Sequence, residues 1–408
     1  MRDVIVIGSG PSGIFAAIAA ANSGSKVLLI EKNNLIGRKI LATGNGRCNL
    51  TNETISADNY HGSVSNISMD IIGRFNQIQT IKYFNGLGVV TKKEDRGRIF
   101  PATNQASTIV TSLSEELKHC GVKVLLDSTV KNIEVTDNYV VFLENGTKFE
   151  SKTLILATGG RAAHQFGSSG DGLFWAKKLG HNITEIYAAL TPIEIEESFI
   201  SKIMGVKFPV TISATVRDEP LIQRSGDIIF THFGISGPAA MSIAGIVAPK
   251  IGKEVIKLSI DLIPNMSEEE LDKMLLEQIE KYPKKSAGNI IAGVLPKSVA
   301  ELIASISKLK DNQNASEISR IQRLTIINNI KFFSLTVKSV RPLKEAQVTS
   351  GGIPLSDIDG TLQSRIIPKL YFAGEILDID GDSGGYNLQW AWSSGKIAGE
   401  YASKNAQK

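Results

Sequence analysis

The N-terminal segment constrains the fold more than any other part of this 408-residue chain. Residues 3–7 (Asp-Val-Ile-Val-Ile) are a nearly continuous apolar run, which is typical of a strand buried on both faces of a parallel sheet. Residues 14–23 are rich in alanine and predict a helix, and residues 26–30 predict a second buried strand. The sequence Gly-Ser-Gly-Pro-Ser-Gly at residues 8–13 separates the first strand from the helix. This order predicts a βαβ unit that binds a dinucleotide.

The three glycines of this turn each have a physical role in binding a dinucleotide. Gly8 permits the tight turn, Gly10 lets the backbone approach a pyrophosphate, and Gly13 allows the helix to pack closely on the strand. Pro11 and Ser12 open the helix, whose amino end presents N–H groups and a partial positive charge to the diphosphate. The turn therefore predicts the phosphate-binding part of a site.

An acidic residue, Glu31, follows the second strand. At about 20 residues beyond the first glycine, a carboxylate can accept hydrogen bonds from both ribose hydroxyls. Its charge also repels a 2′-phosphate, so we expect that the bound nucleotide is not NADP.

Two later glycine signatures indicate FAD rather than NAD. Residues 157–160 (Ala-Thr-Gly-Gly) close a buried strand and resemble the second glycine signature of FAD-dependent oxidoreductases. Residues 370–375 (Leu-Tyr-Phe-Ala-Gly-Glu) resemble their C-terminal signature, in which an acid binds a ribityl hydroxyl. Most such enzymes have aspartate there, so we expect the longer Glu375 to shift this contact. Residues 384–387 (Gly-Gly-Tyr-Asn) then open an apolar helix, whose amino end would stabilise an anionic reduced flavin.

Longer motifs point to one family. They are Gly-Arg-Lys at 37–39, Thr-Gly-Asn-Gly-Arg-Cys-Asn at 43–49, Phe-Thr-His-Phe-Gly-Ile-Ser-Gly-Pro at 230–238 and Gly-Glu-Ile-Leu-Asp at 374–378. On these motifs the chain resembles the bacterial flavoproteins named aminoacetone oxidase-like or dehydro-bile-acid reductase-like, a family of NAD(P)- and FAD-dependent oxidoreductases. The motifs are spread over nearly the whole chain, and the resemblance implies an FAD domain with an inserted β-barrel and a small helical domain.

The resemblance also implies which residues lie along the FAD, among them the glycine-rich loop and Val130, whose backbone would contact the adenine. Asn45 departs from the family, whose members usually have glycine there, but asparagine tolerates a positive φ better than most residues. With the signatures above, the expected cofactor-binding residues are Gly8, Gly10, Pro11, Ser12, Gly13, Glu31, Lys32, Arg38, Lys39, Thr43, Gly44, Cys48, Asn49, Val130, Ala157, Thr158, Gly159, Gly374, Glu375, Asp378, Gly385, Tyr386 and Asn387.

The predicted fold class is α/β, with a Rossmann-like FAD-binding domain of the type that carries two dinucleotide signatures. Its expected companions are an inserted β-barrel domain and a small helical domain. The expected division is an FAD-binding domain at residues 1–190 and 342–408, a barrel at 191–262 and 318–341, and a helical insert at 263–317. Apolar periodicity also predicts one helix over residues 70–87 and one over residues 286–305.

Three single residues have alternative interpretations. Arg47 and Lys39 could lower the pKa of the Cys48 thiol, but the chain has no C-x-x-C partner, so a packing role is favoured. His232 lies between phenylalanines, which favours a core position and leaves catalysis as the weaker alternative. Asp171 is expected to cap the helix that follows it. No other catalytic residue is predicted.

The acidic segment at residues 378–382 (Asp-Ile-Asp-Gly-Asp) invites comparison with a calcium loop. Such a loop has a glycine at its sixth position and a bidentate glutamate at its twelfth. Ser383 and Gln389 occupy those positions here, so we expect no metal site.

Composition argues against several other classes of protein. The net charge is only +4 and no Lys/Arg run exceeds a pair or so, so we expect binding neither to nucleic acid nor to an anionic membrane. No apolar stretch is long enough to span a bilayer, and we expect no signal peptide. Two cysteines cannot build a disulfide framework, which fits reduced thiols in the cytoplasm.

The signatures predict an FAD-dependent oxidoreductase that transfers hydride at flavin N5, with NADH or NADPH as a candidate transient reductant. The family names imply a small organic substrate, which undergoes either amine oxidation or enone reduction. A flavin-binding protein of RNA modification or regulation is the alternative, disfavoured by the mild charge and the lack of a basic C-terminal domain. A dehydrogenase that uses NAD alone is disfavoured by the two FAD-type signatures. The sequence predicts no oligomeric state.

Overall fold

The computed structural model describes every residue from Met1 to Lys408. The chain divides into two compact units, each with its own hydrophobic core: unit 1 comprises residues 1–187 and 343–408, and unit 2 comprises residues 188–342. Unit 1 contains a Rossmann-like α/β sheet and unit 2 contains a closed β-barrel, which confirms the predicted fold class. None of the helices combines the length and the hydropathy that crossing a bilayer requires.

Unit 1 is built on a seven-stranded sheet with the order β7-β2-β1-β10-β9-β8, in which β19 also pairs with β10. β1 pairs in parallel with β2 and β10, and β10 pairs in parallel with β19. β9 joins β10 and β8 in antiparallel fashion. The bounds are β1 Arg2–Ile7, β2 Val27–Ile30, β7 Lys123–Leu125, β8 Val130–Val135, β9 Tyr139–Leu143, β10 Lys148–Leu156 and β19 Leu370–Phe372.

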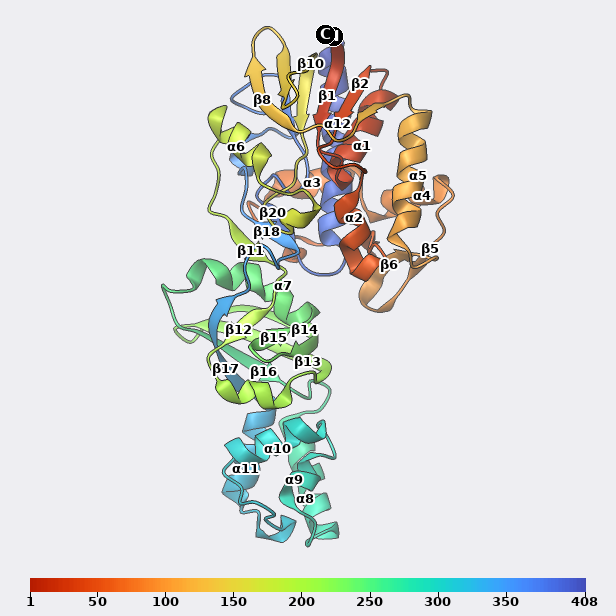
Figure 1. Ribbon diagram of the computed structural model, residues 1–408. Coiled ribbons are helices and arrows are strands. Elements are labelled where there is room, and N and C mark those ends of the chain that lie inside the picture. The colour runs from red at the N-terminus through yellow and green to blue at the C-terminus, as the bar shows by residue number, and fades with distance from the viewer. The chain divides into compact units, whose positions relative to one another are not determined.

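The first and last helices of the chain pack against each other within unit 1. α1 spans Pro11–Asn22 and α12 spans Tyr386–Ala406, and Figure 1 shows them side by side. Glycines permit the close approach, because a Cβ at Gly395 would lie 2.3 Å from the Ser12 carbonyl oxygen. The C-terminal helix therefore completes the domain that the N-terminal strand begins.

Smaller elements surround this sheet. β3, β6 and β5 form a three-stranded sheet, and β20 pairs with β4. Their bounds, with those of β18 and the remaining helices of unit 1, are β3 Thr51–Asn52, β4 Tyr60–Gly62, β5 Thr91–Lys93, β6 Arg98–Pro101, β18 Val348–Ser350, β20 Ile379–Gly381, α2 Arg38–Ala42, α3 Asn66–Arg74, α4 Gln77–Gly86, α5 Ala106–His119 and α6 Asp171–Lys178.

The two long helices predicted from periodicity are each divided in two. Residues 70–87 fall into α3 and α4, because the side chain of Asn76 accepts hydrogen bonds from two backbone N–H groups of the following turn and starts a new helix. Residues 286–305 fall into α9 (Ala287–Ile291) and α10 (Lys297–Ile306). Pro296 precedes α10, and a proline cannot continue the helix before it.

Unit 2 is a closed barrel with the strand order β12-β15-β14-β13-β16-β17. The chain leaves the barrel after β16 and returns at β17, and in Figure 1 the helices between them gather at one end of the barrel. The range 318–341, expected as barrel, thus begins with helix α11. The bounds are β12 Ile193–Ile195, β13 Lys207–Val216, β14 Glu219–Phe230, β15 Gly234–Ser236, α7 Pro238–Val247, β16 Ile256–Asp261, α8 Glu268–Lys281, α11 Arg320–Lys331 and β17 Phe333–Val340.

Candidate functional site

The glycine-rich turn between β1 and α1 is shaped for close backbone contacts. Gly8 has φ +98°, and a Cβ at Gly13 would lie 1.8 Å from the Gly8 carbonyl oxygen, so neither position accommodates a side chain. A Cβ at Gly10, in contrast, would meet no atom within 4 Å. α1 has no side-chain cap, so its first N–H groups face the open space beside Gly10.

Glu31 is buried directly behind this turn. Its Oε2 accepts hydrogen bonds from the N–H and the hydroxyl of Ser9, at 2.8 and 2.7 Å. Its Oε1 accepts from the N–H and the side-chain amide of Asn33, at 2.8 and 2.7 Å. A carboxylate offers about four acceptor positions, so a ribose hydroxyl bound here would displace a side-chain donor, the Ser9 hydroxyl or the Asn33 amide.

Lys32 and Asp171 pair with each other. Lys32 Nζ lies 3.0 Å from Asp171 Oδ2 and 2.5 Å from the Ser169 hydroxyl oxygen. The prediction that Asp171 caps a helix is wrong, because α6 begins at Asp171 itself, with Gly170 as the preceding residue and no side-chain cap. Burial alone would raise the pKa of Asp171, but hydrogen bonds from Ser169 and Lys32 outweigh burial and lower that pKa.

The loop after α2 has a strained, left-handed backbone. Gly44, Asn45, Gly46 and Cys48 all have φ between 56° and 80°. Asn45, where the family resemblance implies a glycine, adopts the left-handed conformation that a glycine would allow. Strain of this kind persists only where the surrounding structure enforces it, and it is concentrated at binding sites.

Cys48 is fully buried in this loop, and its N–H donates to the Thr43 carbonyl oxygen at 3.0 Å. Burial raises the pKa of its thiol to about 12, and a hydrogen bond with Thr43 offsets only part of this. The thiol therefore stays protonated at neutral pH, which supports a packing role rather than a redox role.

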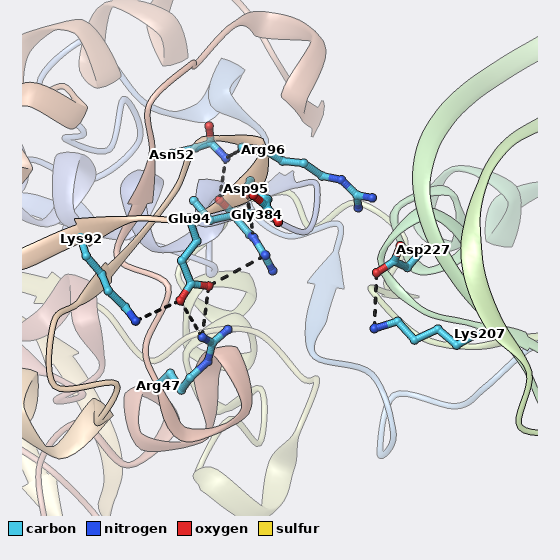
Figure 2. Close-up of polar contacts among 10 residues, drawn as sticks. Arg47, Asn52, Lys92, Glu94, Asp95, Arg96, Lys207, Asp227 and Gly384 are labelled. Carbon is cyan, nitrogen blue, oxygen red and sulfur yellow. Dashed lines mark hydrogen bonds and ion pairs between the residues drawn. The ribbon is translucent and has the colours of Figure 1, made fainter. Parts of the chain in front are cut away.

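Arg47 is paired with an acid and packed against an aromatic ring. Its Nη1 donates to both carboxylate oxygens of Glu94, at 2.9 and 3.1 Å, and its guanidinium lies 4.1 Å from the centre of the Phe100 ring. Figure 2 shows Lys92 reaching the same carboxylate, at 3.2 Å. The charges of this cluster are thus partly neutralised within unit 1.

Glu375 connects the glycine-rich loop to the C-terminal signature. Its Oε2 lies 2.5 Å from Lys39 Nζ, and its Oε1 accepts from the Thr349 N–H at 2.9 Å. Gly374, just before it, has φ +81°, and a Cβ there would lie 2.4 Å from the Ser12 hydroxyl oxygen. Expected cofactor positions from three parts of the sequence are therefore neighbours in unit 1.

The amino end of α12 is anchored from both sides. Asn52 Nδ2 donates to the Gly384 and Arg96 carbonyl oxygens, each at 3.0 Å (Figure 2). The Asn387 side chain donates to the Gly381 carbonyl oxygen and accepts from the Gly381 N–H, at 2.7 and 2.9 Å. Gly385 precedes the helix with φ +103°, and no acidic residue lies in its first turn. This fixed helix end supplies a partial positive charge.

Two buried oxygens in these segments have no hydrogen-bond partner: Thr158 Oγ1 and Asn49 Oδ1. Buried polar atoms are nearly always paired, so these two are exceptions. The Cα of Thr158 lies against Gly8 and its Oγ1 lies against Gly172, while the backbone nitrogen and Cβ of Asn49 lie against Gly44. The open space at Gly10 and the left-handed loop make the cradle fit a dinucleotide such as FAD.

Two further predicted residues lie outside the segments described above. Val130 begins β8 close to Glu31, since the N–H of nearby Ser128 donates to the Glu31 carbonyl oxygen at 2.9 Å. His232 belongs to unit 2 and is exposed in the tight turn between β14 and β15, so the prediction of a core position is wrong. Its ring contacts that of Phe233 edge-on, with centroids 4.9 Å apart.

Sequence reasoning missed several residues of this region. Asn52 ties the helix end in place, and Thr349 accepts hydrogen bonds from the backbone of Arg161 and Ala162, at 2.8 and 2.9 Å. The signal for Thr349 was present, because two glycines follow it closely at residues 351–352 with φ +92° and +152°. Paired glycines after a short buried strand indicate a backbone that approaches something closely.

The model of a known family matches residues 2–401, nearly the whole chain, and its description is HI0933-like protein Rossmann domain. The chain belongs to the HI0933-like family. This agrees with the resemblance found on the four sequence motifs. The family is one of FAD-type oxidoreductases, so the chain is an FAD-dependent oxidoreductase.

Two relatives with similar sequences match nearly the whole chain. It is 34% identical to the 3-dehydro-bile acid delta(4,6)-reductase of Clostridium scindens, over 99% of this chain and 100% of that protein. It is 32% identical to the ribosomal RNA dihydrouridine synthase of Haemophilus influenzae, over 96% of each chain. The 3-ketosteroid delta1-dehydrogenase of Sterolibacterium denitrificans has a similar fold, with a TM-score of 0.53 at 13% identity over 99% of both chains.

Proposed function

We propose that this protein is an FAD-dependent reductase that saturates a ring C=C bond conjugated to a carbonyl group. Chemistry that both full-length relatives share carries the proposal. A 3-dehydro bile acid with Δ4,6 double bonds has a ring ketone conjugated to them. Uridine has a C5=C6 bond conjugated to its C4 carbonyl, and saturating that bond gives dihydrouridine. Each reaction adds a hydride and a proton across a polarised double bond.

The residues of unit 1 suit this chemistry. Bound FAD in its reduced form would supply the hydride. Glu31, Gly10 and Thr158 would hold the adenosine and diphosphate, while Asn49 and Glu375 would contact the part nearer the flavin ring. The amino end of α12, which has no acid in its first turn, would stabilise negative charge on the reduced ring.

Two classes of substrate fit this reaction. A small cyclic enone is the first candidate, since the bile-acid reductase matches this chain at 34% over its full length. A uracil ring in RNA is the second, favoured by the full-length match to the dihydrouridine synthase. The amine-oxidation alternative has no such support from either relative. NADH or NADPH is the candidate reductant.

Anaerobic mixing tests the proposal. The holoprotein is reduced with dithionite and mixed either with a steroid 4-en-3-one or with ribosomal RNA, while the visible absorbance of oxidised flavin is followed. We expect one of the two to reoxidise the flavin and to gain two hydrogens by mass. If neither does, while an amine reduces the oxidised protein, the direction of the proposed reaction is wrong. Parallel reduction with NADH and with NADPH identifies the physiological donor.

A further inference from the structure

A buried acid, Asp380, lies in the segment that joins two expected cofactor positions, Glu375 and Gly385. It is in the middle of β20, which pairs in antiparallel fashion with β4, and its partner across the ladder is His61. Directly opposed residues of an antiparallel pair project on the same face. The strands are close here, since a Cβ at Gly62 would lie 2.5 Å from the Asp378 carbonyl oxygen.

Asp380 has an unused oxygen in an environment that disfavours its charge. The residue is 3% exposed, and its Oδ1 has no hydrogen-bond partner. Burial raises the pKa of its carboxyl to about 6; the charge of His61 and a hydrogen bond from Ser350 oppose this, while the neighbouring acids Asp378 and Glu375 add to it. Asp380 is therefore a carboxyl that can hold and release a proton near neutral pH.

His61, the partner of Asp380 across the ladder, is partly exposed to solvent. Its Nε2 lies 2.9 Å from Asp382 Oδ1, and its side chain is 18% exposed. An imidazole has two ring nitrogens, so it can accept a proton at one of them and donate a proton from the other. The order from the outside inward is thus solvent, His61 with Asp382, and then Asp380.

The other side of Asp380 leads to the candidate cofactor site. Ser350, its hydrogen-bond partner, directly follows Thr349, and the Thr349 N–H donates to Glu375 at 2.9 Å. Glu375 is in turn paired with Lys39. The buried acid therefore lies beside residues that the sequence assigns to the cofactor.

We propose that Asp380 stores the proton for the reduction and that His61 reloads it from water. This rests on the proposed function. Bound FAD in its reduced form would supply a hydride, with its two electrons, to the carbon distal to the carbonyl. The π electrons of the substrate form the second C–H bond with the proton from the Asp380 carboxyl, whose O–H electron pair stays on the carboxylate. Protonated His61 then restores the acid and takes its own proton from water.

Variants at both residues test the relay. Asp380→Asn keeps the shape of the side chain but cannot release a proton, and Asp357→Asn alters a second buried carboxyl of unit 1, bonded to Asn182, as a matched control. Single-turnover reoxidation by the conjugated substrate should slow by about 10²–10⁴-fold in Asp380→Asn. Reoxidation by ferricyanide, which needs no proton, should be unchanged, as should the FAD content.

The pH profile and His61 separate a relay from a structural role. In the wild type the single-turnover rate should fall as pH rises through about 6, and Asp380→Asn should lose this dependence. His61→Gln should leave the first turnover intact, slow repeated turnover with excess dithionite, and recover with added imidazole. In the protein with ¹³C-labelled aspartate, a carboxyl resonance should titrate near the same pH and vanish in Asp380→Asn.

The outcomes distinguish the relay from the reaction it serves. If the wild type reduces the substrate and Asp380→Asn does so at the same rate and with the same pH dependence, Asp380 is not the proton store. An aspartate resonance that titrates at the ordinary value for that residue overturns it too. A wild type inert toward both substrate classes overturns the proposed function, and the relay falls with it.

Discussion

The two units differ in how their buried polar atoms are satisfied. In unit 1 four buried side-chain oxygens have no partner, those of Asn49, Tyr83, Thr158 and Asp380, whereas no such oxygen occurs in unit 2. In unit 2, largely buried cations are paired with acids: Lys331 Nζ lies 2.7 Å from Asp261, and Arg323 Nε lies 2.6 Å from Asp272.

This difference coincides with the position of the expected cofactor residues, which all belong to unit 1. An unpaired buried oxygen costs about 1–3 kcal/mol, and the buried oxygens of unit 2 carry no such cost. We therefore expect cofactor binding to be sensitive to changes in unit 1 and insensitive to changes in unit 2.

The largest effect should come from the glycine turn. Gly10→Ala should fold normally, because its Cβ meets nothing within 4 Å, yet should bind FAD more weakly by at least about 100-fold, roughly 2.7 kcal/mol, because the methyl group fills the phosphate space. Gly13→Ala should instead lose the fold of unit 1. Fluorescence titration with FAD and thermal unfolding separate the two.

Gly288→Ala in α9 of unit 2 is the matched control, since its Cβ also meets nothing within 4 Å. It should leave FAD affinity unchanged and raise the free energy of unfolding by about 0.4–1 kcal/mol, because alanine loses less conformational entropy in a helix than glycine does. A Gly10→Ala protein that keeps its FAD would contradict the expectation that cofactor binding depends on this part of unit 1.

Glu31→Ala should weaken FAD binding by about 10- to 100-fold, since two charge-assisted hydrogen bonds are lost and water compensates in part. Glu31→Gln should be milder because it keeps one acceptor. The FAD-free alanine variant should also be less stable, because Ser9 and Asn33 lose their acceptor. Equilibrium titration checks this, with exposed Glu115→Ala as the control, and an unchanged affinity would mean that the ribose binds elsewhere.

Asp380→Asn should raise the melting temperature at pH 8 by a few degrees, at roughly 2–4 °C per kcal/mol. Because the folded-state pKa of Asp380 is raised to about 6 from 3.8, ionised Asp380 lowers the free energy of unfolding as pH rises through this window. At pH 4 the carboxyl is protonated, so the difference should nearly vanish. Calorimetry at both values checks this, and a variant less stable at pH 8 would contradict it.

The smallest effect on the cofactor should follow a change in unit 2. His232→Ala should leave the FAD content within about twofold of the wild type, because its side chain is exposed in a turn of the barrel. It should alter turnover or apparent substrate affinity if this turn selects the substrate. Loss of flavin from a folded variant would mean that the motif at residues 230–238 belongs to the cofactor site.

The sequence predicted the parts that depend on local pattern. The strand, glycine turn and helix at the N-terminus follow from hydrophobic periodicity, from the positive φ of Gly8 and from the close contact that excludes a side chain at Gly13. Helix boundaries were less accessible, since a single capping residue, Asn76, divides a periodic stretch. His232 was misplaced because its aromatic neighbours suggest a core, whereas a tight turn exposes it.

Asp380 could not have been found from one sequence. Its properties depend on the pairing of β20 with β4, which brings residue 380 beside residue 61. Its unpaired oxygen depends on packing from elements far apart in the chain. Nothing in the local run of acids at 378–382 distinguishes one member from the others.

Nucleotide release from the purified protein tests whether unit 1 binds one FAD. The purified protein is denatured by heat, and the released nucleotide is identified by mass and quantified against the protein. We predict one FAD per chain and no NAD. FMN as the released species, or no flavin even after reconstitution with FAD, would contradict the account.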